Sequence, residues 1–169
     1  MVTGVTENDN STIEYITFFI KEKIYAFPSR YFQGIAGNPN IIETSSKLDF
    51  ALGTFHLSKM NVPVIDLNVF LGNTPSKYSI KNSIGIIGFT NKKKEQLLGF
   101  IVDSMFSMHS FYPQELKKVP TTSPFIKGII EEQNEKIIIV DLEKILNDKK
   151  VKDFLDHYEM HLKSKETAC

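Results

Sequence analysis

Three aspartates, Asp66, Asp103 and Asp141, each follow a run of apolar residues and are the residues best placed for chemistry in this chain of 169 residues. Two carboxylates held close together can divide the roles of general acid and general base between them. The triplets Asp-Thr-Gly and Asp-Ser-Gly are both missing, because Asp103 and Ser104 are followed by Met105. A small enzyme that uses these carboxylates is one hypothesis, and a structural role of the same residues is the other.

The four histidines make a weaker case for a metal site. His157 and His161 are four residues apart in a segment with helical spacing, so both could lie on one face of a helix. The zinc motif His-Glu-x-x-His is missing, because Tyr158 follows His157, and a solvated helix face accounts for the pair. The chain also lacks Gly-x-Ser-x-Gly and a glycine-rich phosphate loop, and its one cysteine is the terminal Cys169. The sequence predicts no catalytic residue, no metal and no cofactor.

Charge and hydropathy argue against several other classes of protein. The chain has 20 basic and 20 acidic residues, so no overall charge draws it toward nucleic acid or an anionic membrane. Lys92, Lys93 and Lys94 form one basic cluster, which the adjacent Glu95 and the zero net charge favour as a solvated turn. Residues 1–10 are polar, and no apolar run approaches the ~18 residues of a membrane span. We predict a cytoplasmic protein without membrane insertion or nucleic-acid binding.

Short apolar runs rich in Ile, Val, Phe and Tyr, separated by polar turns, predict a mainly β protein. Three pairs of runs predict hairpins, namely 15–20 with 24–27, 84–89 with 97–102, and 126–130 with 136–140. Only the C-terminal segment has helical spacing, with an apolar stripe of Val151, Phe154, Leu155, Tyr158 and Leu162. We expect an amphipathic helix there that docks on the strands and ends in a loose tail.

One stretch of the sequence recurs 75 positions later without a gap. The shift places Phe50 on Phe125, Gly53 on Gly128, Val62 on Ile137, Val64 on Ile139, Asp66 on Asp141 and Leu67 on Leu142. So many matches at one offset indicate two related units, and two small β-barrels side by side suit the short strands. In each unit the aspartate precedes apolar residues at +1, +4 and +5, which is the spacing of one short helix with that aspartate as N-cap. Helix capping thus explains Asp66 and Asp141 without catalysis.

Four stretches, in the same order along the chain, resemble the CheW-like family, the coupling adaptors of bacterial chemosensory arrays. They lie at residues 15–28, 53–67, 98–105 and 125–142, and include Pro-Val-Ile-Asp-Leu at 63–67 and Gly-Phe-Ile-Val-Asp at 99–103. The resemblance spans roughly residues 13–146, which is nearly all of the expected folded part. Each stretch is short, but the four together are specific.

The resemblance implies two SH3-like five-stranded β-barrels without enzyme activity, to which the C-terminal amphipathic helix is added. We predict a flexible N-terminus over residues 1–12, a CheW-like domain over 13–146, and a C-terminal helix and tail over 147–169. The barrels would divide near 13–83 and 84–146, with exchange of strands between them allowed. The family links the cytoplasmic tips of chemoreceptors to the regulatory domain of a CheA-type histidine kinase. Hydrophobic barrel edges make those contacts, in keeping with affinity carried by a few apolar anchors.

Two positions depart from the family's pattern. The family's Asn-Leu-Arg-Gly is His56-Leu57-Ser58-Lys59 here, so the arginine associated with receptor coupling falls on Ser58, and a family glutamate falls on Gly34. A serine hydroxyl cannot make the paired hydrogen bonds of a guanidinium, so we predict an altered receptor surface. The predicted partner contacts are Phe32, Gly34, Ile35, His56, Leu57, Ser58 and Lys59 in the first barrel, and Val102, Met105 and Met108 in the second. For the last three, packing in a strand core is an equal alternative.

Two rival hypotheses stay open at this stage. One is a CheW-fold interaction module that no longer couples receptors and binds another regulator, for example in pilus or motility control. The other is the small enzyme that uses Asp66, Asp103 and Asp141. Capture of the binding partners distinguishes the first rival from a receptor-coupling adaptor, and Asp→Asn substitution distinguishes the second.

Overall fold

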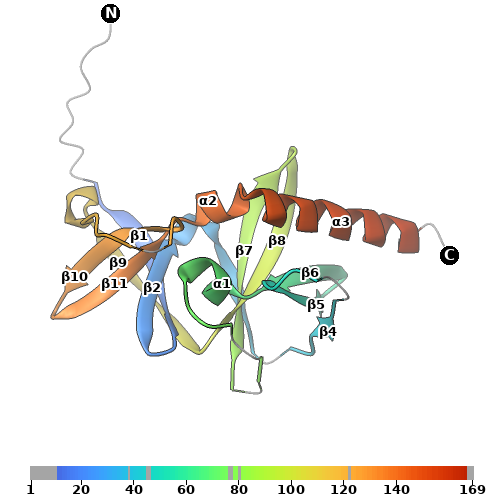
Figure 1. Ribbon diagram of the computed structural model, residues 1–169, viewed down its shortest axis with the longest axis horizontal. Helices are drawn as coiled ribbons and strands as arrows, with labels where there is room; N and C mark the ends of the chain where they lie inside the picture. The colour runs from blue at the N-terminus through green and yellow to red at the C-terminus, as the bar shows by residue number, and fades with distance from the viewer. Residues whose placement is uncertain are drawn as a thin grey trace, which may run out of the picture.

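A computed structural model describes residues 11–37, 39–44, 47–75, 78–79, 81–121 and 123–166, without the side chains of residues 105–106 and 159–166. Residues 1–10 of the predicted flexible N-terminus lie outside the described residues, as does Cys169. The described part is mainly β, with two sheets side by side and helices along them (Figure 1). The predicted fold class is confirmed.

The strands form two sheets of mostly antiparallel neighbours. The first sheet has the order β10 (Ile126–Glu132), β11 (Glu135–Val140), β2 (Lys23–Pro28), β1 (Ile13–Ile20) and β9 (Ser104–Phe111). The second sheet has the order β3 (Phe32–Gly37), β7 (Ser83–Asn91), β8 (Lys94–Val102), β6 (Met60–Ile65), β5 (Ala51–Leu57) and β4 (Ile42–Glu43). The three predicted hairpins are present as β1 with β2, β7 with β8, and β10 with β11. Each turns through two residues with positive φ, a conformation whose twist matches that of the flanking strands.

Neither sheet corresponds to one half of the sequence. The first sheet combines β1 and β2 with β9, β10 and β11 from the second half, and the second sheet combines β7 and β8 with β3 to β6 from the first half. Two short parallel ladders join strands from different halves of the sequence. In one, Ile139 of β11 lies beside Ala26 of β2, and in the other, Val64 of β6 lies beside Gly99 of β8. The expected boundary between 13–83 and 84–146 therefore separates two sequence repeats, and each barrel takes strands from both. Apolar patterns specify hairpins, but they do not identify a parallel partner from a distant segment.

The repeat of 75 positions recurs in the geometry that ends each half. Asp66 precedes α1 (Leu67–Leu71) and Asp141 precedes α2 (Leu142–Leu146), and each carboxylate accepts a hydrogen bond from a backbone N–H of the first turn, at 3.0 and 3.1 Å respectively. The backbone N–H groups of the two aspartates donate to the carbonyl oxygens of Phe50 and Phe125, at 2.8 and 2.7 Å. Each half of the sequence thus ends in a short helix that is capped by an aspartate.

Two glycines of the repeat are required by a close approach of neighbouring backbone. The ladder shifts register beside Gly53 and again beside Gly128. A Cβ on Gly53 would collide with the carbonyl oxygen of Ile42, and a Cβ on Gly128 would collide with that of Lys117. Ile42 and Lys117 are themselves 75 positions apart, so the repeat includes the segment that packs on each glycine. Only glycine fits such a bulge without displacing the adjacent chain.

The largest core lies between the two sheets. Phe18, Phe27 and Phe100 meet there with ring centroids 5.4–5.6 Å apart. The C-terminal helix α3 (Lys149–Glu166) runs across the second sheet and adds Phe154 and Leu155 to the same core (Figure 1). Because both sheets and α3 bury side chains in one core, we expect them to unfold together.

Replacing the capping aspartates is expected to lower the free energy of unfolding. Asp141→Ala should cost about 1 kcal/mol. Asp66→Ala should cost about 2 kcal/mol, because Asp66 is 1% exposed and its loss leaves a buried N–H without this acceptor. Urea denaturation followed by circular dichroism measures both values. Asp153→Ala, on the exposed side of α3, is the matched control and should stay within about 0.5 kcal/mol of the original protein. Unchanged stability in both capping variants would contradict the role of these carboxylates.

Candidate partner-binding surface

The first group of predicted contacts lies on β3, an edge strand of the second sheet. β3 pairs with β7 on one side, and no described strand pairs with its other side. Phe32 and Ile35 are half-buried, and Phe32 packs against the core between the sheets. A Cβ added to Gly34 would meet no atom within 4 Å. β3 therefore offers a backbone edge and open space, while Phe32 also serves the core.

The second group, residues 56–59, forms the end of β5 and the turn into β6. All four residues are exposed, and Ser58 occupies the first turn position with a left-handed φ of 54°. The exposed fraction is 37% for Leu57 and 49% for Met60, the residue that follows the turn. Two exposed apolar side chains thus flank a polar turn, a composition that suits a protein contact with a few apolar anchors.

The third group, around β8 and β9, divides between core and surface. Val102 is fully buried in the core between the sheets, so its predicted role as a partner contact is corrected to core packing. The physical reason is that β8 is an inner strand with a neighbour on each side. Met108 is 57% exposed on β9, an edge strand of the first sheet. The side chain of Met105 lies outside the described part of the chain, although its backbone belongs to β9.

The exchange of strands also changes which contacts share a barrel. Residues 32–35 and 56–59, expected on a first barrel built from the first half, lie in the sheet that is completed by the β7–β8 hairpin. Met108 lies in the sheet that begins with β1 and β2. The two groups from the first half therefore belong to one sheet, and β9 belongs to the other.

A hollow of about 350 Å³, which we name the first hollow, lies between β3 and the start of β6. Gln33 of β3 and Met60 of β6 both line it, together with Phe89 and Leu97 from the β7–β8 hairpin. Arg30 also lines it, from η1 (Ser29–Tyr31), the short 3-10 helix that joins β2 to β3, and the remaining lining residues come from the β7–β8 hairpin. The hollow is thus lined by residues next to both predicted contact segments, Gln33 beside Phe32 and Met60 beside Lys59.

A second hollow of about 620 Å³ adjoins the first one. The two share Arg30 and Phe89, and the second extends to α2 and α3, where Glu143 and Lys152 line it. Arg30 therefore lies on the border of both hollows, at the seam between the two sheets.

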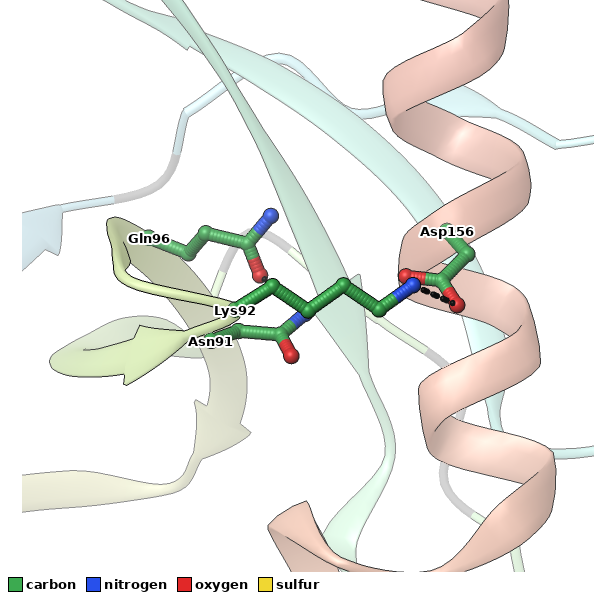
Figure 2. Close-up of polar contacts among 4 residues, drawn as sticks. All are labelled: Asn91, Lys92, Gln96 and Asp156. Carbon is green, nitrogen blue, oxygen red and sulfur yellow. Dashed lines mark hydrogen bonds and ion pairs between the residues drawn. The ribbon is translucent and has the colours of Figure 1, made fainter.

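The tip of the β7–β8 hairpin, which borders the second hollow, is tied to α3 (Figure 2). Lys92 Nζ lies 2.9 Å from Asp156 Oδ2, and Figure 2 shows the lysine reaching across to the helix. Asn91 Nδ2 donates to Gln96 Oε1 at 3.0 Å within the same hairpin. The ion pair is exposed and contributes little stability by itself, so the apolar packing of α3 is what holds this wall of the hollow.

The Arg30 side chain is held against its neighbour Tyr31. Its Nη2 donates to the Tyr31 hydroxyl at 3.1 Å, and its guanidinium carbon lies 4.8 Å from the centre of the Tyr31 ring. The hydrogen bond raises the pKa of Arg30 above its ordinary value, so the group stays positively charged. Stacking of a guanidinium on an aromatic face restricts its orientation.

Sequence reasoning missed Arg30, Gln33 and Met60 as parts of this surface. Each lies within two residues of a predicted contact, so its place in the chain was the available signal. Exposed polar residues have no periodic pattern, and the exposure of Met60 depends on the strand neighbours that the fold provides. The sequence located the segments but not the hollow between them.

The aspartates of the enzyme hypothesis each have a structural hydrogen bond. Asp66 and Asp141 cap helices, and Asp103 accepts from the backbone N–H of Lys21 at 2.6 Å and from Asn82 Nδ2 at 2.8 Å. Among the residues that the structure describes, no three His, Cys, Asp or Glu side chains gather as a metal site would require. Over the same ranges, no helix is both long and apolar enough to cross a bilayer.

Comparison with known proteins finds one matching family model and several similar chains. The family model described as CheW-like domain matches residues 14–150. The chemotaxis protein CheV3 of Helicobacter pylori is 29% identical over 139 residues, which cover 78% of this chain and 44% of CheV3, so the chain spans less than half of that relative. The chemotaxis protein CheW of Klebsiella aerogenes is 22% identical over 139 residues, which cover 79% of this chain and 81% of that protein. The CheW of Thermotoga maritima is 23% identical over 143 residues, which cover 83% and 91% respectively.

A solved structure has the same fold. The crystal structure of the scaffolding protein TtCheW from Thermoanaerobacter tengcongensis superimposes with a TM-score of 0.67 and 19% sequence identity. The match covers 88% of this chain and 94% of that one. At this level of identity the likeness concerns the fold, and it includes both barrels because nearly all of the two chains is covered.

The contrast between Val102 and Met108 gives a direct test of core against surface. Val102→Ala should lower the free energy of unfolding by about 2 kcal/mol, because it removes buried methyl groups and leaves a cavity. Met108→Ala should change it by less than about 0.5 kcal/mol, because the side chain is mostly exposed. Urea denaturation of the two variants measures the difference. Equal losses of stability would show that Met108 also belongs to the core and is unavailable to a partner.

Proposed function

The chain belongs to the CheW-like family, and from that premise we propose that it is a non-enzymatic adaptor that couples chemoreceptors to a CheA-type histidine kinase through barrel-edge contacts. Membership makes it a CheW-like scaffold of chemotaxis. The choice of partners goes further and is our proposal. We place its action in the cytoplasm, at membrane-associated receptor arrays.

One observation carries the proposal: Gln33 of the edge strand β3 and Met60, the residue that follows the exposed turn at 56–59, line one hollow. The surface combines an unpaired strand edge with the exposed apolar side chains of Leu57 and Met60. An open edge gives a partner backbone hydrogen bonds, and apolar anchors give it buried area. Met108 on β9 supports a second contact on the other sheet, as an adaptor with two partners requires.

Two residues of this surface support an altered receptor contact. Ser58 stands where the family resemblance implies a receptor-coupling arginine, and Gly34 stands where it implies a glutamate. Lys59 carries a positive charge one position further on, but an ammonium group lacks the planar fork of a guanidinium. These differences favour a second candidate function, an interaction module of the same fold that no longer couples receptors and binds another regulator, for example in pilus or motility control.

Binding measurements with purified partners separate the two candidates. The probes are the regulatory domain of the CheA-type kinase and the cytoplasmic fragment of a chemoreceptor, both from the same genome, with this chain immobilised for biolayer interferometry. The adaptor hypothesis predicts binding to both, and binding to the kinase alone would favour the module without receptor coupling. Binding to neither would overturn the proposed function.

Restoring the guanidinium in the turn should strengthen receptor binding. Ser58→Arg is expected to raise the affinity for the receptor fragment about tenfold, because a guanidinium makes charge-assisted, paired hydrogen bonds worth about 1.4 kcal/mol here. Gln133→Arg is the matched control, because Gln133 is exposed at the first position of another hairpin turn, with a φ of 49°. The same increase in both variants would assign the gain to charge alone and contradict a specific role of the 56–59 turn.

A further inference from the structure

Arg30 is the only arginine in the chain, and the fold places it at a junction. It lies in η1, which leads from β2 of the first sheet to β3 of the second. It lines both the first and the second hollow. The Arg30 side chain therefore borders both hollows, which together form a recess between the β7–β8 hairpin, the edge strand β3 and the two C-terminal helices.

The guanidinium is exposed, yet it is held in place. Its hydrogen bond and its stacking both involve Tyr31, whose ring packs against the core between the sheets. Among the described residues, no carboxylate lies within ion-pair distance of Arg30, and Glu143 acts on it only through a longer-range charge interaction. A guanidinium carries five N–H donors, and the hydrogen bond to Tyr31 uses one of them.

The charges around the recess restrict what it can bind. Lys92 is paired with Asp156, and the acids Glu95 and Glu143 offset Lys152 and Arg30, so the two hollows together carry no net positive charge that would attract an extended polyanion. Three apolar side chains, those of Met60, Phe89 and Leu97, line the first hollow among polar ones. A single carboxylate that neighbours an apolar side chain satisfies both conditions, whereas a nucleic acid or a highly phosphorylated ligand does not.

We propose that Arg30 binds a carboxylate of the partner protein, and that an apolar side chain from the same partner segment enters the first hollow beside Met60 and Leu97. The proposal rests on the proposed function, because the partner is one of the two proteins named there. A guanidinium binds a carboxylate with two parallel hydrogen bonds, which fixes orientation as well as adding affinity. Because Tyr31 already restricts Arg30, less conformational entropy is lost on binding than with a freely moving lysine.

Substitution of Arg30 in the full-length chain tests the proposal against the two probes, the kinase regulatory domain and the receptor fragment. Arg30→Gln should weaken binding to one of them at least tenfold. Arg30→Lys keeps the charge but loses the planar fork, so it should weaken the same complex several-fold. Lys136→Gln is the matched control, an exposed cation on β11 that lines neither hollow, and it should bind like the original chain. Raising the salt concentration should reduce the difference between Arg30→Gln and the original chain.

The outcomes separate this inference from the function on which it rests. If the original chain binds a probe and both Arg30 variants bind it equally tightly, the inference is overturned and the adaptor function stands. If the original chain binds neither probe, the proposed function fails and the inference fails with it. Urea denaturation verifies that the Arg30→Gln variant is folded. If that variant is unfolded, the binding of the Arg30→Lys variant decides the test instead. Coupling between Arg30→Gln and Asp→Asn or Glu→Gln changes in the partner then identifies the carboxylate.

Discussion

Two short parallel ladders, β11 on β2 and β6 on β8, determine how the rest of the structure is arranged. Each ladder joins a strand of one sequence half to a hairpin of the other, so neither sheet is complete without both halves. Pairing of distant segments costs loop-closure entropy, which burial of the phenylalanine cluster between the sheets offsets. The two barrels therefore share their stability, and a change in one half affects both.

The candidate surface is a consequence of this exchange. After β2 the chain must leave the first sheet and enter the second, and it does so through the three residues of η1. That crossing places Arg30 at the seam and begins β3 at an open edge. The remaining walls come from the β7–β8 hairpin and from α3, which is held by Phe154 and Leu155 in the shared core. Because packed strands and helices line the hollows, their geometry is set before a partner arrives.

Sequence patterns within short segments predicted the capped helices and the hairpins, but not the contacts between distant segments. The aspartate spacing predicted α1 and α2 because a short helix needs its cap next to it in sequence. The hairpins were predicted for the same reason, but the pairing between halves was not, because alternation reports burial and not the identity of the neighbouring strand. Val102 and Met108 illustrate this limit: both are apolar and close in sequence, yet β8 is an inner strand and β9 an edge strand. The hollow needed the three-dimensional arrangement, because its lining comes from segments that are far apart in the chain.

The same structure explains how the contact surface can change while the fold does not. Gly53 and Gly128 are fixed by neighbouring carbonyl groups, and Asp66 is fixed by its helix. Neighbouring atoms set no such limit on the exposed Ser58 or on Gly34, where a Cβ would meet no atom within 4 Å, although the φ of 156° at Gly34 strains any side chain placed there. Replacements at these two positions alter what a partner meets without disturbing the core. The guanidinium that the family resemblance places in the turn is missing at Ser58, while Arg30 provides one at the seam, on a hollow that extends to Met60, the residue after that turn. A planar cationic donor is therefore still present on this surface, but it approaches a partner from the seam between the sheets, and a partner must place its carboxylate there to use it.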